Sequence, residues 1–389
     1  MKKINVKGIY TYYFIYILDC ILSESQLIEF PSINLLLKFL KYGVVVLLLL
    51  QCIPNKIKIE KLSFIPILLF LISLVINAVF AGGGIRLVSF SIILLSFIVY
   101  DIDTAIITKI TYLSLIYGYI FVVLLSFIGV LEDRIYNRYT GTELGNFFSG
   151  EYTRHTFGFL VQNQIPSTLL IVYILRIIYK NGSMKLYEHL IVMFFNFVFF
   201  ITFGSRISFI VTLFIQIAVI LLSRKSNKKN RRLCCLWIIF PTSFLISLLT
   251  ALNYNAESQL WRIMDNIFMN RIVMSYEAIK TIGIRIFGAG KDAINSFSVT
   301  GLDTVTLDNG YINLLISTGA IITLFIVLLW TWFAYRVEKE RDNYLLIILV
   351  GLAVINLIDA YFTSYKLFPL YCMMIEKYKS CNMKDCEEL

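Results

Sequence analysis

The chain has 389 residues, of which 58% are apolar and 15% are charged, and its lysines and arginines outnumber its acids to give a net charge of +10. Soluble domains carry about 45–50% apolar and about 25% charged residues, and a single core of this length cannot cover so large an apolar surplus. The composition therefore excludes a cytosolic enzyme, a disulfide-rich secreted scaffold and a disordered chain, and it predicts an all-α polytopic membrane protein.

Apolar runs suited to membrane helices follow one another along the whole chain. A helix crosses the hydrocarbon core in about 20 residues, with a range of about 17–25. On that scale the sequence predicts about 12 transmembrane helices within a single integral membrane domain, 1–389. These spans are expected near 9–22, 33–53, 62–80, 86–100, 106–130, 156–179, 187–203, 206–223, 233–251, 309–334, 344–359 and 364–376.

The lysines and arginines predict the orientation of these spans, because cytoplasmic loops carry an excess of positive charge. Basic residues gather near both ends of the chain and in the loops near 56–61, 176–185, 224–232 and 336–341. We therefore expect both termini to be cytoplasmic. The basic run at 224–232 is interpreted as the cytoplasmic anchor of a span, and no nucleic acid partner is expected.

Two longer segments are predicted on the outer side of the membrane. The first, 131–155, is rich in tyrosine and glycine, and the second, 252–308, carries several aromatic side chains. Loops longer than about 12–15 residues are usually functional or disordered, and the aromatic content of 252–308 predicts a large folded extracytoplasmic loop. Within it, 260–282 is expected to form one helix with Arg271 in the middle of its apolar stripe.

Three arginines are predicted on the outer face, against the positive-inside bias: Arg154, Arg206 and Arg271. An arginine on an apolar face needs an anionic partner or a wet cavity. Converging arginines suit a phosphate or diphosphate, which their planar forks can bind bidentately. The alternative for each is an interfacial anchor whose guanidinium reaches the lipid headgroups.

Other polar residues near the predicted outer face are candidates for substrate contacts and proton transfer. Gln162 and Asn163 open a span, where polar side chains usually face a cavity. Asp308 or His155 could take a proton from a sugar hydroxyl, although Asp308 could instead be a helix N-cap and His155 a structural hydrogen-bond donor. No metal or cofactor is expected, because the cysteines and histidines lack metal-ligand spacing.

Several short motifs occur in an order that resembles the Wzy-type polymerases of O-antigen and capsular polysaccharide, which are relatives of the O-antigen ligases. About twelve spans, cytoplasmic termini and a large outer loop near the C-terminus belong to the same resemblance. The motifs are Gly204-Ser205-Arg206, Asn270-Arg271, Phe287-Gly288-Ala289-Gly290, and Asp308-Asn309-Gly310-Tyr311 leading into Leu314-Leu315-Ile316-Ser317-Thr318-Gly319.

The resemblance implies a GT-C-like, inverting glycosyltransferase that polymerises undecaprenyl-diphosphate-linked oligosaccharide repeat units into capsule or O-antigen. It implies a site on the outer face of the bacterial cytoplasmic membrane, where Arg206 and Arg271, with Arg154, hold the diphosphate. Asp308 or His155 would be the catalytic base. The expected partners are these lipid-linked glycans and the lipid bilayer, together with a flippase and a chain-length regulator. The residues expected to line the substrate are Gln162, Asn163, Asn309 and Tyr311.

Two other functions stay open at this point. An O-antigen ligase-type transferase resembles the chain in the same motifs, but the ligases tend to carry histidine where this chain has Asp308, which favours a polymerase. A lipid-linked oligosaccharide flippase would have a similar number of spans and a cationic cavity. Flippases show internal repeats of two halves, which this sequence lacks, and they do not need a long folded outer loop.

Overall fold

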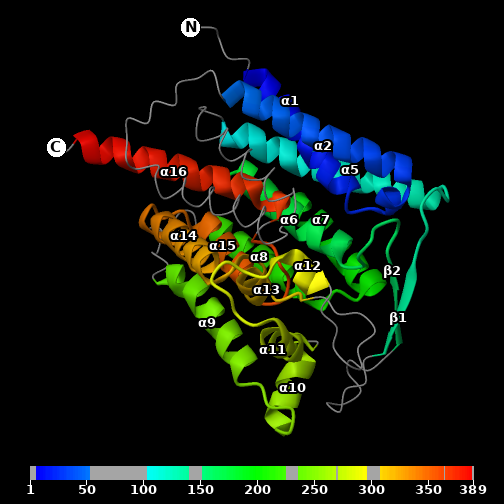
Figure 1. The fold of residues 1–389 in the computed structure, drawn as a ribbon. Coiled ribbons are helices and arrows are strands. Elements are labelled where there is room, and N and C mark those ends of the chain that lie inside the picture. The colour runs from blue at the N-terminus through cyan, green and yellow to red at the C-terminus, as the bar shows by residue number, and fades with distance from the viewer. Residues whose placement is uncertain are drawn as a thin grey trace. The chain divides into compact units, whose positions relative to one another are not determined.

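The computed structural model describes residues 6–52, 103–139, 151–224, 235–268, 270–295, 307–362 and 364–387. The spans expected near 62–80 and 86–100 lie outside these residues. The described chain is mostly helical, as predicted, and it divides into two compact units (Figure 1). Unit 1 comprises Met1–Lys58, Ile92–Arg224 and Tyr365–Leu389, and unit 2 comprises Ile59–Ser91 and Lys225–Ser364.

Four described helices are long and apolar enough to cross a membrane, which indicates a membrane protein. They are α5 (Thr104–Phe127), α7 (Leu186–Phe203), α8 (Arg206–Arg224) and α14 (Ala320–Lys339). Further apolar helices accompany these four, namely α1 (Val6–Leu22), α2 (Pro31–Cys52), α6 (Gln164–Tyr179), α9 (Ile239–Leu252) and α15 (Asn343–Ile355).

Unit 1 is a bundle in which α1 packs between α2 and α5, and α5 also contacts α6 and α16 (Phe368–Glu387) (Figure 1). The Tyr13 hydroxyl of α1 is hydrogen-bonded to Thr111 Oγ1 of α5 at 2.7 Å. Further along the same pair of helices, a Cβ at Gly118 would lie 2.9 Å from Ile21 Cδ1. Glycine at this position therefore allows the two helices to approach closely.

The segment 131–155 contributes a β-hairpin to unit 1, which was not predicted from the sequence. Strands β1 (Ile135–Tyr139) and β2 (Glu151–His155) are antiparallel, and Tyr136 pairs with Arg154 while Ile135 pairs with His155. Because neighbouring residues of a strand point to opposite faces, the side chains of Arg154 and His155 leave β2 on opposite sides.

Lys366 is buried in unit 1 and bonds to α5, to α6 and to the turn after α1. Its Nζ lies 3.2 Å from Glu24 Oε2 and donates to the hydroxyls of Tyr119 at 2.8 Å and Thr168 at 3.1 Å. The hydroxyls of Tyr119 and Tyr365 donate to the same Glu24 oxygen. A buried cation is stable only when its charge and its protons are paired, so this network fixes α5, α6 and the start of the C-terminal segment together.

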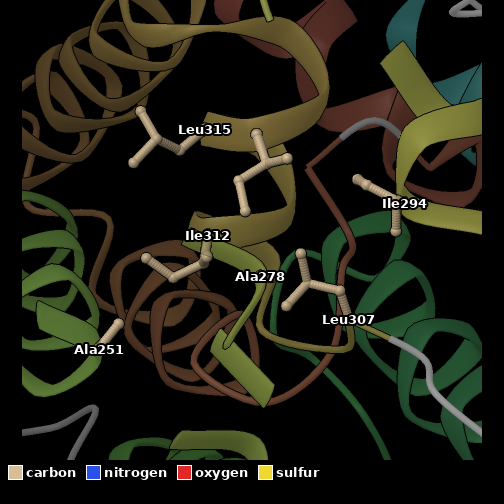
Figure 2. Close-up of a cluster of buried hydrophobic side chains, with 7 residues drawn as sticks. Ala251, Ala278, Ile294, Leu307, Ile312 and Leu315 are labelled. Atoms are coloured by element: carbon tan, nitrogen blue, oxygen red, sulfur yellow. The ribbon is translucent and has the colours of Figure 1, made fainter. Parts of the chain in front are cut away.

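Unit 2 contains a small apolar core that joins the segment 252–308 to the helices on either side of it. Helices α11 (Arg271–Ile282), α12 (Gly290–Asn295) and α13 (Gly310–Thr318) meet α9 there, and Figure 2 shows how their side chains point toward one another. The buried members of this core are Ala251, Ala278, Ile294, Leu307, Ile312, Leu315 and Ile316.

Two elements predicted as continuous helices are broken in the structure. The helix expected over 260–282 consists of α10 (Gln259–Ile267) and α11, and Asn270 between them has a φ of 64°. The span expected over 309–334 consists of α13 and α14, which are separated by Gly319 at φ 90° and ψ 169°. Both predictions were wrong about continuity, because apolar periodicity carries no information about the long-range backbone contacts that stabilise such breaks.

Replacing Lys366 tests the buried network of unit 1. Lys366→Met should destabilise the protein by about 3–5 kcal/mol, because it leaves the partly buried Glu24 carboxylate without its cation. The double variant Glu24→Gln, Lys366→Met should be more stable than Lys366→Met alone. Thermal unfolding of the purified protein in detergent measures both effects, with Lys109→Met on the exposed side of α5 as the control. A melting temperature for Lys366→Met equal to that of the control would contradict this account.

Candidate functional site

In unit 2, the position of Arg271 is fixed by a cap at the beginning of α11. Arg271 is the first residue of this helix and follows Asn270, whose short polar side chain tolerates the left-handed backbone conformation. Asp265 of α10 accepts hydrogen bonds from the backbone N–H groups of Ile272 and Val273, both at 3.0 Å. These N–H groups have no partner inside the helix, so the Asp265 carboxylate caps α11 and determines where Arg271 begins it.

Burial affects the carboxyl of Asp265 as well. Removal from water raises the pKa of this group, and the two backbone N–H groups that it accepts from oppose that shift. The N-terminus of α11 therefore replaces part of the water that the carboxyl loses, and the carboxyl in turn caps the helix.

The guanidinium of Arg271 joins three segments of unit 2. Its Nε donates to the Ile358 carbonyl at 2.7 Å, and one terminal nitrogen donates to Asp308 Oδ2 at 3.1 Å and lies 3.9 Å from Asp359 Oδ1. The Arg271 side chain is only 8% exposed, whereas that of Asp308 is 33% exposed. The arginine is thus enclosed by its partners, whereas the carboxylate that it orients remains partly accessible to solvent.

Asn309, and not Asp308, caps α13. The side-chain oxygen of Asn309 accepts from the backbone N–H groups of Tyr311 at 3.1 Å and Ile312 at 3.2 Å, and its amide nitrogen donates to Ser247 Oγ. The alternative interpretation of Asp308 as the helix cap was therefore wrong. Because Asn309 satisfies the helix terminus, the carboxylate of the preceding residue is available to Arg271.

The glycine after this cap is required by a close backbone approach. Gly310 donates its N–H to the Asn356 carbonyl at 2.8 Å, and a Cβ at Gly310 would lie 2.7 Å from the Asp359 carbonyl oxygen. The Asp308-Asn309-Gly310 motif therefore lies directly against the turn after α15 that carries Asp359. Tyr311 points into the core, where it is fully buried and its hydroxyl donates to the Ala353 carbonyl at 3.3 Å.

In unit 1, Arg154 contacts the tight turn between α7 and α8, and Arg206 is the first residue after this turn. Helix α7 ends at Phe203, Gly204 follows with a φ of 61°, and α8 begins at Arg206. The buried Arg154 donates from Nη2 to the Gly204 carbonyl at 3.2 Å, and a Cβ at Gly204 would lie 3.4 Å from Arg154 Nε. A cation is favourable at a helix C-terminus, where carbonyl groups lack partners, so Arg154 also stabilises the end of α7.

His155 of unit 1 is held by a carboxylate. Its Nδ1 lies 2.6 Å from Asp133 Oδ2, and the other oxygen of Asp133 accepts from the N–H groups of Thr156 and Phe157. The imidazole also stacks on the Phe157 ring at a centroid distance of 5.3 Å. With Nδ1 engaged in this way, Nε2 is the ring nitrogen at which a proton could be exchanged, and the His155 side chain is 30% exposed.

The two amides predicted to line the substrate, Gln162 and Asn163, lie in the turn that leads into α6. The Asn163 side-chain oxygen is buried and accepts no hydrogen bond from the part of the chain that the structure describes. Since buried acceptors are normally satisfied, a donor such as a sugar hydroxyl or a water would suit this atom.

The structure thus divides the predicted site residues between the units. Arg154, His155 and Arg206 lie in unit 1, whereas Arg271 and Asp308 lie in unit 2. The convergence of all three arginines on one diphosphate stays a prediction. Within the described ranges, no group of three or more His, Cys, Asp or Glu side chains is arranged to hold a metal ion.

Three carboxylates that organise these clusters were not singled out from the sequence: Asp133, Asp265 and Asp359. Each acts on a residue that is distant in sequence or in a different element, as Asp133 does on His155. A usable signal existed only for Asp359, which is an acid at the end of an apolar run that was predicted as a span. Asp133 lies in polar loop sequence, and Asp265 lies in a predicted helix that also carries other polar residues, so neither acid stands out.

Comparison with known proteins finds no family model, no curated protein and no solved structure that matches this chain. The function of the protein is therefore inferred from its own residues and their geometry.

Substitution of Asp265 tests how Arg271 is positioned. Asp265→Ala removes the acceptor for two N–H groups of α11 and should destabilise the protein by about 1 kcal/mol. Asp265→Asn is the matched control, because it keeps a side-chain oxygen at the same place without the charge. Hydrogen exchange at Ile272 and Val273 should accelerate in Asp265→Ala and change little in Asp265→Asn. Unchanged exchange in Asp265→Ala would show that this carboxylate does not cap α11.

Proposed function

We propose that the protein is a membrane glycosyltransferase that polymerises lipid-diphosphate-linked oligosaccharide units at the outer face of the bacterial cytoplasmic membrane. The observation that carries the proposal is the Arg271–Asp308 pair of unit 2, in which a buried guanidinium orients a partly exposed carboxylate. A carboxylate held in this way suits general-base catalysis on a sugar hydroxyl. The order of motifs that resembles the Wzy-type polymerases supports the same function.

The charges around Arg271 support a role in orienting Asp308. Its guanidinium faces two carboxylates, Asp308 and Asp359, so this cluster carries net negative charge when both are ionised. A diphosphate would be repelled from such a cluster unless the carboxylates moved away. We therefore assign Arg271 to orientation of Asp308, in place of the diphosphate contact that the resemblance implies.

The arginines of unit 1 are better suited to the diphosphate. Arg154 contacts Gly204 at the junction of α7 and α8, and Arg206 is the first residue of α8. The N-terminal N–H groups and the positive dipole end of α8 would add to the charge of the arginines. The proposal places the lipid diphosphate at this end of unit 1.

The reaction requires one bond to form and one to break. The acceptor hydroxyl oxygen attacks the anomeric carbon of the donor sugar while the bond from that carbon to the diphosphate oxygen breaks, which inverts the anomeric centre. The hydroxyl proton passes to the base, for which Asp308 and His155 are the two candidates, and the bonding electrons leave with the lipid diphosphate. Arg154 and Arg206 would stabilise the negative charge that develops on the leaving group.

His155 is the second candidate for the base, because its pairing with Asp133 leaves Nε2 for proton exchange. The pairing resembles the orientation of a catalytic imidazole by a carboxylate. His155 belongs to the same unit as the proposed diphosphate arginines, whereas Asp308 belongs to the other unit. Comparing the activities of Asp308 and His155 variants therefore distinguishes the two candidates.

The proposal includes the partners implied by the resemblance. The substrates would be undecaprenyl-diphosphate-linked glycans within the lipid bilayer, delivered by a flippase, and a chain-length regulator would act on the product. Both termini would lie in the cytoplasm, with about twelve spans in a GT-C-like arrangement.

An extension assay with purified protein tests these assignments. The substrate is the lipid-linked unit extracted from cells that lack the protein. Asp308→Asn should lower kcat by roughly 10²–10⁴-fold, the usual loss when acid–base help is removed, while His155→Gln keeps most of the activity. Glu257→Gln, which changes an exposed acid of the outer loop, is the control. Full activity of Asp308→Asn with a large loss in His155→Gln would transfer the role of the base to His155.

The same assay separates binding of the diphosphate from proton transfer. Arg206→Lys keeps the positive charge but loses the planar fork, so the KM for the lipid-linked unit should rise more than kcat falls. Arg271→Lys should instead lower kcat, because Asp308 would lose its orientation. A selective rise of KM in Arg271→Lys would instead indicate that Arg271 contacts the diphosphate.

A further inference from the structure

The break between α13 and α14 leaves backbone N–H and C=O groups without helical partners at the beginning of α14, a helix that is apolar enough to span a membrane. Gly319 separates the two helices, and α14 is one of the four described candidate spans. Each helix end at such a break lacks partners for several of its N–H or C=O groups. In hydrocarbon these groups must be satisfied by protein, because lipid offers no hydrogen bonds.

A segment of the outer loop supplies the missing partners. Ala320 donates its N–H to the Arg285 carbonyl at 3.0 Å, and Ile321 donates to the Ile286 carbonyl at 3.4 Å. In the opposite direction, Ala289 donates to the Ile316 carbonyl at 2.8 Å. The segment 285–289 therefore pairs with the end of α13 and with the beginning of α14.

Two glycines make this pairing possible. Gly288 has a φ of 79° and Gly319 a φ of 90°, and a Cβ on either would overlap backbone atoms of the other segment. The motif Phe287-Gly288-Ala289-Gly290 is thus part of a contact between two backbones. This contact explains why both glycines occur where they do, since only glycine combines positive φ with so close an approach.

The same segment presents apolar side chains outward. Ile286 is 62% and Phe287 is 65% exposed, and the adjoining surface of α14 exposes Ile321 by 53% and Leu324 by 50%. The hydrogen bond between the backbones of Ile321 and Ile286 shows that these surfaces are neighbours. Large exposed apolar residues that extend the surface of a membrane span are expected to face lipid.

We propose that 285–289 is a re-entrant segment of the outer loop, which lies at the membrane depth of the α13–α14 break and contacts the hydrocarbon of the outer leaflet through Ile286 and Phe287. The exposed Arg285 sets the depth, because its guanidinium has to reach the headgroups. The inference concerns contact with the lipid bilayer and does not depend on the proposed glycosyl transfer.

Nitroxide labels on the full-length protein test the proposal. Single cysteines replace Ile286 or Phe287 in a background without other cysteines, and the labelled protein is reconstituted into vesicles of phosphatidylcholine and phosphatidylglycerol. Collision with oxygen reports hydrocarbon, and collision with a water-soluble nickel complex reports water. Leu324→Cys on α14 is the lipid control, and Glu257→Cys in the exposed part of the outer loop is the water control.

Both test positions should be accessible to oxygen and protected from nickel, as at Leu324. Accessibility to nickel like that of Glu257 at either position would place the segment in water and overturn the proposal. Protection from both reagents would show that protein covers these side chains, which would also overturn the lipid contact. The two positions are labelled separately. If one variant does not fold, the label at the other position still tests the lipid contact.

Discussion

Polar groups that leave water in this protein must find their partners within the chain, because the surrounding surface is largely apolar and lipid offers no hydrogen bonds. This constraint explains the most informative contacts of both units. In unit 1 the buried Lys366 is paired with Glu24 and with hydroxyl groups. In unit 2 the buried Arg271 is paired with Asp308, Asp359 and a backbone carbonyl.

The same constraint connects the fold of unit 2 to its proposed chemistry. Capping of α11 by Asp265 places Arg271 at a helix start, and capping of α13 by Asn309 releases Asp308 to pair with that arginine. The guanidinium becomes enclosed while the carboxylate keeps an exposed face. A group that is held firmly and remains accessible is what general-base catalysis requires. The candidate site therefore follows from how the helix termini are satisfied.

Much of the helical architecture could be predicted from the sequence, because apolar length is a strong signal for membrane helices. The runs expected near 187–203 and 206–223 correspond to α7 and α8, and the run near 344–359 includes α15. The breaks at Asn270 and Gly319 could not be predicted, because each depends on partners from other segments, such as Asp265 and the carbonyl of Arg285. A periodic apolar pattern continues across such a break without any change.

The candidate site was only partly predictable for a similar reason. Asp308 and His155 stood out because each is a titratable residue at a predicted membrane boundary. Their partners are separated from them in sequence, Arg271 from Asp308 by 37 positions and Asp133 from His155 by 22. Pairing across such distances is a property of the tertiary fold, and a single sequence contains no pattern that specifies it.

The central claim is that this protein joins lipid-linked units to one another. The most direct test is to reconstitute the purified wild-type protein in vesicles with the lipid-linked unit as the only glycan and to separate the products by length. The account predicts a ladder of lipid-linked chains that increase by one repeat unit, with release of free lipid diphosphate. Movement of unchanged units between the two leaflets, without any ladder, would contradict the account and identify the protein as a flippase.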